Sequence, residues 1–178
     1  TFFNKKISCR YGQNPGSPAA FYTEENARGA CTANIEVLQE GKGLGYINIG
    51  DLDLAQRLTK SLYDTSDGKL VATIVKHEMP SGVARGGSPL LAYEVAWGTD
   101  SLSSFGGVVA LSYEVDKEVA EKLIIPVRNT EVIVAPCYTK EALEVLLERE
   151  PLRVVKMPDI DEKVEDNGLE YKRTEGGL

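Results

Sequence analysis

The residues best suited to proton transfer are a lysine and a histidine that stand side by side, Lys76 and His77. His77 is the only histidine among 178 residues. An imidazole changes charge near neutral pH, and a neighbouring ammonium can supply positive charge or a second proton. The pair is a candidate for acid–base chemistry, although a lone histidine is more often an ordinary surface or core residue, so both interpretations stay open at this point.

Residues 70–75 form an apolar run directly before this pair, and such a run is typical of a strand buried on both faces. The Pro- and Gly-containing segment 79–82 after it predicts a turn. In parallel α/β sheets ligands collect at the carboxyl ends of the strands. We therefore expect His77 to lie at that edge, together with Pro136, which ends another apolar run.

Other catalytic chemistries are poorly supported by the sequence. One histidine and three scattered cysteines, without a Cys-x-x-Cys pair or a His-x-Glu motif, do not make a structural zinc site or a zinc-deaminase site. No Gly-x-Ser-x-Gly motif of a serine hydrolase is present. Residues 85–88 precede a predicted helix and could bind phosphate through backbone N–H groups, but they lack the Walker spacing and its lysine. An ordinary turn is the better interpretation there.

The remaining candidates lie in the polar segment 7–34, which is rich in turn residues and predicts an irregular loop. Within it, Arg10 could contact a phosphate with two hydrogen bonds, and Tyr11 could stack on a flat ring. Taken alone, this pair is better interpreted as part of a structural loop.

Alternating strands and helices predict an α/β domain with a largely parallel sheet covered on both faces. Expected helices begin after the capping residues Asp51, Ser88, Asp116 and Thr139 and end near residues 63, 97, 123 and 147. Expected strands cover residues 35–39, 70–75, 108–112, 132–135 and 153–155. Residues 159–167 are acidic and predict an exposed connector, and 169–173 could be an edge strand.

Composition narrows the functional classes. With 42% hydrophobic and 26% charged residues the chain is typical of a soluble domain. A net charge of −7 leaves no basic stripe, so we expect no nucleic-acid or membrane-surface partner, although a small anionic ligand is compatible. Few cysteines, and no recognisable signal or membrane-spanning segment, predict a cytoplasmic protein.

Five segments spread along nearly the whole chain are informative when they are taken together. They are Arg10-Tyr11-Gly12-Gln13-Asn14-Pro15, Tyr46-Ile47-Asn48-Ile49-Gly50-Asp51, Val75-Lys76-His77 with Pro80-Ser81-Gly82, Ser103-Ser104-Phe105-Gly106-Gly107, and Glu131-Val132-Ile133-Val134-Ala135-Pro136. In this order they resemble one family, the AICAR transformylase part of the bifunctional purine biosynthesis proteins. After the Asn-Pro of the first segment the family commonly has His-Gln, where this chain has Gly16-Ser17.

The resemblance implies a three-layer α/β/α, cytidine-deaminase-like fold with a mixed, largely parallel sheet and no zinc. It also implies a single domain over residues 1–178, the first half of the transformylase region. Residues 1–34 would be its irregular nucleotide-binding loop region. Residues 159–178 would lead toward a second half that lies outside this sequence.

The implied activity is transfer of the formyl group of 10-formyltetrahydrofolate, as co-substrate, to the 5-amino group of aminoimidazole carboxamide ribotide (AICAR) in IMP synthesis, without a bound metal. Lys76 and His77 would be the catalytic pair. Implied partners are the nucleotide, the folate, and either a second copy of the chain or a second transformylase subdomain. The implied substrate-binding residues are Arg10, Tyr11, Asn48, Phe105, Gly106 and Glu131.

A different class of function stays open. Without a second subdomain, the chain could be a nucleotide-binding half-module or sensor that performs no chemistry. Retention of Lys76 and His77 favours the enzyme, and separate titrations with ribotide and folate would discriminate the two.

Overall fold

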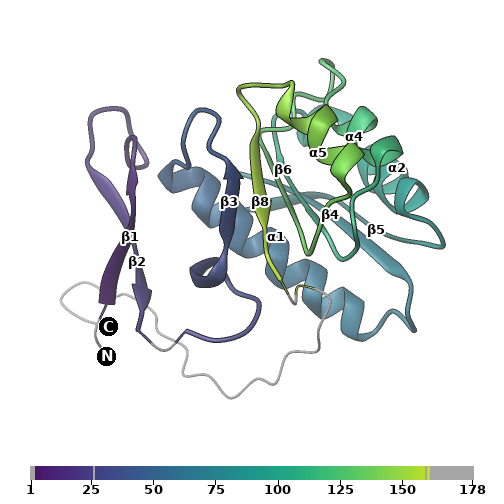
Figure 1. Cartoon of the computed structure of the whole chain (residues 1–178), viewed down its shortest axis with the longest axis horizontal. Helices are drawn as coiled ribbons and strands as arrows, with labels where there is room; N and C mark the ends of the chain where they lie inside the picture. The colour runs from purple at the N-terminus through teal and green to yellow at the C-terminus, as the bar shows by residue number, and fades with distance from the viewer. Residues whose placement is uncertain (1–2, 26, 159, 161–178) are drawn as a thin grey trace.

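The structure of the chain is a computed structural model that describes residues 3–25, 27–158 and 160. Its centre is a six-stranded mixed sheet with the strand order β3-β8-β7-β6-β4-β5 (Figure 1). The strands of this sheet are β3 (Glu36–Gln39), β4 (Leu70–Lys76), β5 (Met79–Gly86), β6 (Val108–Leu111), β7 (Val132–Ala135) and β8 (Arg153–Lys156).

Helices cover both faces of the sheet, as the sequence predicted. The helix α1 (Tyr46–Asp64) packs on one face, where Leu52 and Ala55 join a core with alternate residues of the strands. The helices α2 (Pro89–Thr99), α4 (Lys117–Leu123) and α5 (Lys140–Leu147) cover the other face, and α3 (Ser101–Ser104) is a single turn before β6. The three-layer α/β/α architecture is thereby confirmed. No described helix is both long and apolar enough to cross a membrane.

The sheet is mixed, as predicted, but it is not largely parallel. Only β6 with β7 and β7 with β8 pair in parallel, whereas β3 with β8, β4 with β6 and β4 with β5 are antiparallel. The reason is local: no crossover helix follows β4, so the chain turns back at once into β5. The parallel part is restricted to the three strands that α4 and α5 connect.

The turn predicted at residues 79–82 is instead the first half of β5. Lys76 pairs with Met79, so the reversal is made by only two residues, His77 and Glu78. Both have left-handed backbone angles, with φ of 52° and 56°. Pro80 is tolerated because β5 is the edge strand of the sheet.

Residues 7–34 are also more regular than predicted. The strands β1 (Phe3–Cys9) and β2 (Ala19–Glu24) form a separate antiparallel hairpin, and a short 3-10 helix spans Thr32–Asn34. The turn residues Asn14, Pro15 and Gly16 connect the two strands rather than disrupting the whole segment. The predicted connector and edge strand at 159–173 lie outside the described residues, apart from Ile160.

Local capping signals predicted three helices correctly. The side chains of Ser88, Asp116 and Thr139 accept hydrogen bonds from the third residue of their helices, at 3.3, 2.9 and 3.1 Å. The predicted cap at Asp51 is wrong, because α1 begins at Tyr46 and Asp51 lies inside the helix with only 4% of its surface exposed.

Tyr113, buried under α2, predicts a loss of stability in alkali. Its hydroxyl donates to the Pro89 carbonyl at 2.8 Å, and burial, with smaller contributions from Tyr93 and Asp116, raises its pKa. A raised folded-state pKa contributes stability that is complete below the unfolded-state value of about 10 and is lost as pH rises above it. We expect urea midpoints to fall between pH 9 and 11, and to fall less steeply in Tyr113→Phe.

The matched control for that measurement is Tyr22→Phe, because the Tyr22 side chain is exposed on β2. It should leave the alkaline fall in the midpoint unchanged. An equally steep fall in Tyr113→Phe and in the unmodified protein would contradict the assignment.

Candidate functional site

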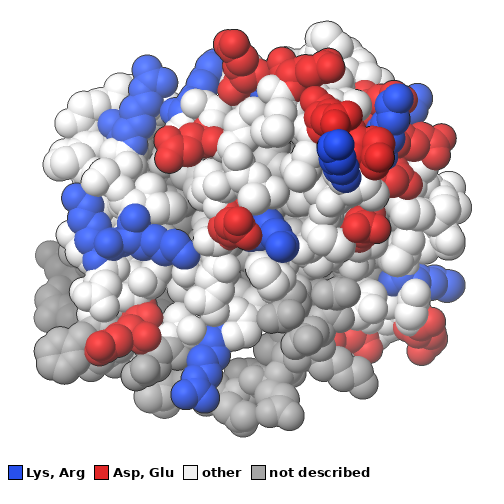
Figure 2. Space-filling view, in the orientation of Figure 1, with Lys and Arg blue, Asp and Glu red and all other residues white. Residues whose placement is uncertain are grey.

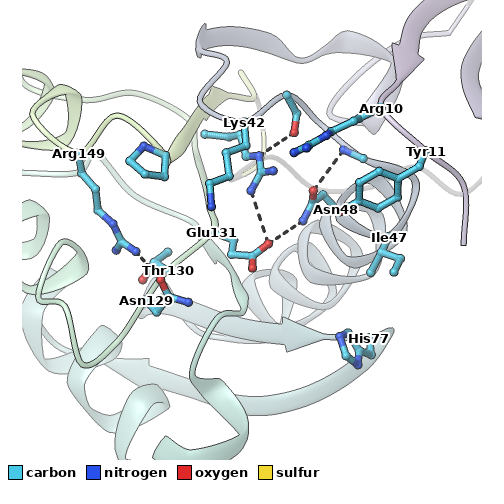
Figure 3. Close-up of a pocket in the computed structure, with 14 residues that line it drawn as sticks. Arg10, Tyr11, Lys42, Ile47, Asn48, His77, Asn129, Thr130, Glu131 and Arg149 are labelled. Atoms are coloured by element: carbon cyan, nitrogen blue, oxygen red, sulfur yellow. Dashed lines mark hydrogen bonds and ion pairs between the residues drawn. The ribbon is translucent and has the colours of Figure 1, made fainter. Parts of the chain in front are cut away.

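A cavity of about 370 Å³ opens at one edge of the sheet, between the β1–β2 hairpin and the loops around β7 and β8 (Figure 3). This volume lies at the lower end of the range of small-molecule sites. Five separate segments contribute its walls: residues 10–11 after β1, 42–48 around the start of α1, the His77 turn, 129–131 before β7, and 149–153 before and in β8.

The site lies at the amino ends of the parallel strands, not at their carboxyl ends as predicted. Glu131 precedes β7 and Arg153 opens β8, whereas Pro136 follows β7 and so lies at the opposite edge. His77 joins the site because β4 runs antiparallel to β6, which brings the carboxyl end of β4 to the same edge.

Glu131 is the centre of a hydrogen-bonded network on the cavity floor. Its Oε2 accepts from Asn48 Nδ2 at 3.2 Å and forms an ion pair with Arg153 Nη1 at 3.5 Å (Figure 3). Asn48 Oδ1 in turn accepts from the Gly45 N–H at 3.2 Å, and Arg153 Nε donates to the Gly43 carbonyl at 2.8 Å. The network joins the start of α1 to β7 and β8 and fixes the orientation of both side chains that hold Glu131.

Positive charge predominates on the cavity walls, although the chain as a whole is acidic. Acidic side chains crowd the upper right of Figure 2, over the region of α4 and α5. The lining, in contrast, has one carboxylate, Glu131, and four cationic side chains. These are Arg10, Lys42, Arg149 and Arg153.

Arg149 is the cavity cation with a buried donor that has no hydrogen-bond partner. Its Nη2 donates to Asn129 Oδ1 at 2.8 Å, while its Nη1 is buried without a hydrogen-bond partner. Burial lowers the pKa of Arg149, and Glu131 opposes this effect. A half-buried guanidinium with one buried, unpartnered N–H group is a favourable place for an anion.

Arg10 and Tyr11 reach the cavity from the end of β1 (Figure 3). The Arg10 guanidinium lies 5.8 Å from the centre of the Tyr11 ring, and the ring is 39% exposed. The two side chains present a cation and a flat apolar surface on the side of the cavity opposite Arg149 (Figure 3).

His77 lies on the cavity wall, whereas Lys76 lies beside the cavity and does not line it. The Lys76 ammonium donates to the Phe105 carbonyl at 2.7 Å and lies 5.9 Å from the centre of the Phe105 ring. Gly106 has a left-handed φ of 76°, and a Cβ on it would meet Asn129, Glu131 and Lys76 at 3.6 to 3.9 Å. Lys76, Phe105 and Gly106 therefore border the cavity across Asn129 and Glu131.

The structure thus brings the eight predicted site residues to one edge. Arg10, Tyr11, Asn48, His77 and Glu131 line the cavity, and Lys76, Phe105 and Gly106 lie next to it.

The sequence analysis missed three of the four cavity cations, namely Lys42, Arg149 and Arg153. One signal was available: Arg153 opens the apolar run of β8, and a charged residue in a buried strand requires a partner. Within the described ranges, no group of three or more His, Cys, Asp or Glu side chains is placed to hold a metal ion.

Comparisons with known proteins identify a family and, among the solved structures, a similar fold. A family model described as AICARFT/IMPCHase bienzyme matches residues 1–178, the whole chain. The solved structure of dCMP deaminase from the cyanophage S-TIM5, in apo form, is similar with a TM-score of 0.46 and 13% sequence identity. That similarity covers 60% of this chain and 94% of the deaminase chain.

Proposed function

The chain belongs to the AICARFT/IMPCHase bienzyme family of purine biosynthesis, and from this premise we propose that it is a formyltransferase domain acting on AICAR. The reaction would move the formyl group of 10-formyltetrahydrofolate to the 5-amino group of the ribotide. The observation that carries the proposal is the position of the single imidazole, His77, on the wall of a cavity lined by four cations.

His77 would act as the general base. The 5-amino group is a poor nucleophile because its lone pair is delocalised into the imidazole carboxamide. Attack on the formyl carbon therefore requires removal of an amine proton as the new C–N bond forms. The His77 imidazole lines the cavity and is the group available to accept that proton.

Lys76 would assist departure of the folate nitrogen. Attack produces a tetrahedral intermediate with a negative oxygen, which a nearby ammonium stabilises by charge. When the bond from the formyl carbon to N10 breaks, N10 takes a proton, which the Lys76 ammonium can donate. The cycle closes when His77 releases the amine proton to solvent and Lys76 takes a proton back from solvent. The Lys76–Phe105 hydrogen bond fixes the ammonium at the cavity border for this role.

The remaining cavity groups match the other parts of a ribotide. The unpartnered Nη1 of Arg149 and the nearby cations suit a phosphate, and the Tyr11 ring suits the flat base. Glu131 and Asn48 suit the carboxamide of the ribotide. The Glu131 carboxylate can accept from its amide hydrogens, and the Asn48 side chain can donate to its oxygen or accept from its hydrogens.

Loss of the Arg149 charge should weaken ribotide binding. A hydrogen bond to a charged group contributes about 1.5–3 kcal/mol, so we expect Arg149→Met to raise the ribotide Kd roughly 10- to 100-fold. Calorimetry would measure this. The same variant should bind the corresponding nucleoside, which lacks the phosphate, about as well as the unmodified protein does.

Lys140→Met is the matched control. Lys140 is a cation at the exposed start of α5, paired with Glu144 at 3.9 Å, and it lies outside the cavity lining. It should not change the ribotide Kd. Equal losses in both variants would indicate general electrostatic attraction instead of a phosphate contact.

A second candidate is a nucleotide-binding half-module, which the small size of the cavity favours. A volume of about 370 Å³ suits one small ligand better than a ribotide and a folate together. Separate calorimetric titrations with the two ligands, alongside a formyl-transfer assay, decide between the candidates. Turnover supports the enzyme; ribotide binding without folate binding or turnover supports the half-module; and failure to bind ribotide refutes both.

A further inference from the structure

His77, the proposed base, has a backbone conformation that is unfavourable for a residue of its type. His77 and Glu78 form the whole turn between β4 and β5, and both have the left-handed φ that a type I′ hairpin turn requires. Such turns prefer Asn and Gly, because L residues with larger side chains rarely adopt this conformation. An interaction with a residue outside the turn must therefore stabilise this left-handed conformation.

A buried carboxylate on α1 contacts this turn. Asp51 Oδ1 accepts a hydrogen bond from the Glu78 N–H at 2.5 Å, and only 4% of the Asp51 surface is exposed. The preceding residue is Gly50, where a Cβ would come within 2.5 Å of Glu78 Oε1. The helix thus carries an acceptor for the turn's backbone and, next to it, the space for the turn's side chain.

Helix capping does not explain Asp51. The helix α1 begins at Tyr46, and its N-terminal cap is provided by Asn48, which accepts from the Gly45 N–H. A carboxylate inside a helix and almost out of contact with solvent is unfavourable unless it is hydrogen-bonded. The hydrogen bond from the Glu78 N–H satisfies the Asp51 carboxylate and explains its position inside the helix.

We propose that Asp51 is a positioning residue that fixes the His77 imidazole on the cavity wall by holding the His77-Glu78 turn in its left-handed form. Asp51 acts through the backbone, as a hydrogen-bond acceptor, and takes no part in proton transfer. The catalytic consequence rests on the proposed function of His77, whereas the structural consequence does not.

Three variants test the proposal through formyl-transfer kinetics. A displacement of about 1 Å at a catalytic group can reduce turnover about 100-fold, so Asp51→Ala should lower kcat roughly 10- to 100-fold while the ribotide Kd changes little. Asp51→Asn retains an acceptor oxygen and should keep most of the activity. Asp51→Ala with Glu78→Gly should recover much of kcat relative to Asp51→Ala, because glycine adopts the turn without help.

Two kinetic outcomes would overturn the proposal. If Asp51→Asn loses as much as Asp51→Ala, the negative charge matters and not the acceptor. If Glu78→Gly gives no recovery in a folded double variant, Asp51 does not act through the turn. Asp53→Ala removes the same charge from a half-buried position on α1 that is outside the cavity lining, and it should leave kcat unchanged.

A second readout does not depend on activity. Because His77 is the only histidine, untagged protein gives a single imidazole Cε1–H signal in a carbon–proton NMR spectrum. This signal should shift on addition of ribotide, and the shift should be lost or much reduced in Asp51→Ala. If the signal shifts in the unmodified protein and not in Asp51→Ala, but no formyl transfer is measured, the positioning role of Asp51 is supported and the formyltransferase proposal fails. An equal shift in Asp51→Ala refutes the positioning role.

Discussion

Replacing His77 by alanine should reduce formyl transfer by roughly 10²- to 10⁴-fold, the contribution of a general base. The ribotide Kd should change little, because the cations and the Glu131 network that would hold the nucleotide come from other segments. A single-turnover assay and calorimetry on the same preparation would measure both quantities.

The control for this prediction must separate the imidazole from the turn that carries it. Alanine at a φ of 52° is unfavourable, so His77→Ala could act through the backbone. Asparagine adopts this conformation more readily, and His77→Asn should therefore keep the turn and still lose activity to the same extent. Normal turnover in either variant would refute the role of His77 as base.

Replacing Gly82 by alanine should destabilise the fold by more than about 3 kcal/mol, beyond the usual range for overpacking. A Cβ at Gly82 would lie 2.0 Å from the Ala96 carbonyl oxygen, and a backbone atom of α2 cannot move aside without displacing the helix. Urea unfolding followed by circular dichroism would give the change in free energy of unfolding.

Gly87→Ala is the matched control, since a Cβ there meets no atom within 4 Å and its φ is not left-handed. We expect a change of less than about 0.5 kcal/mol, as for other surface substitutions. If Gly82→Ala were equally harmless, β5 and α2 would have to pack farther apart than the structure has them.

Elements with local signals were predictable from the sequence. A helix that starts at Ser88, Asp116 or Thr139 carries its own cap, and the buried strands are short apolar runs. The strand β5 was not predictable in this way. Its Pro80 and Gly82 are turn residues by propensity, but Gly82 is required by contact with α2 and Pro80 is permitted by an edge position.

The candidate site was predictable only in part for a related reason. The family-like segments gave His77, Glu131 and the Arg10-Tyr11 pair, but which strand ends meet depends on strand direction. The antiparallel pairing of β4 with β6 places the site at an edge where parallel α/β reasoning does not expect it. Arg149, near the end of α5, carries no sequence signal that distinguishes it from a surface residue.

The contacts that close the cavity join distant parts of the chain. The bond from Arg153 to Gly43 spans 110 residues, and the bond from Asn48 to Glu131 spans 83. The hairpin with His77, by contrast, is made by consecutive strands. Contacts close in sequence form with less loss of chain entropy and hence earlier in folding. The turn that carries His77 would therefore form in a newly made chain before the cavity does, and the chain could bind ligand only once β8 has docked.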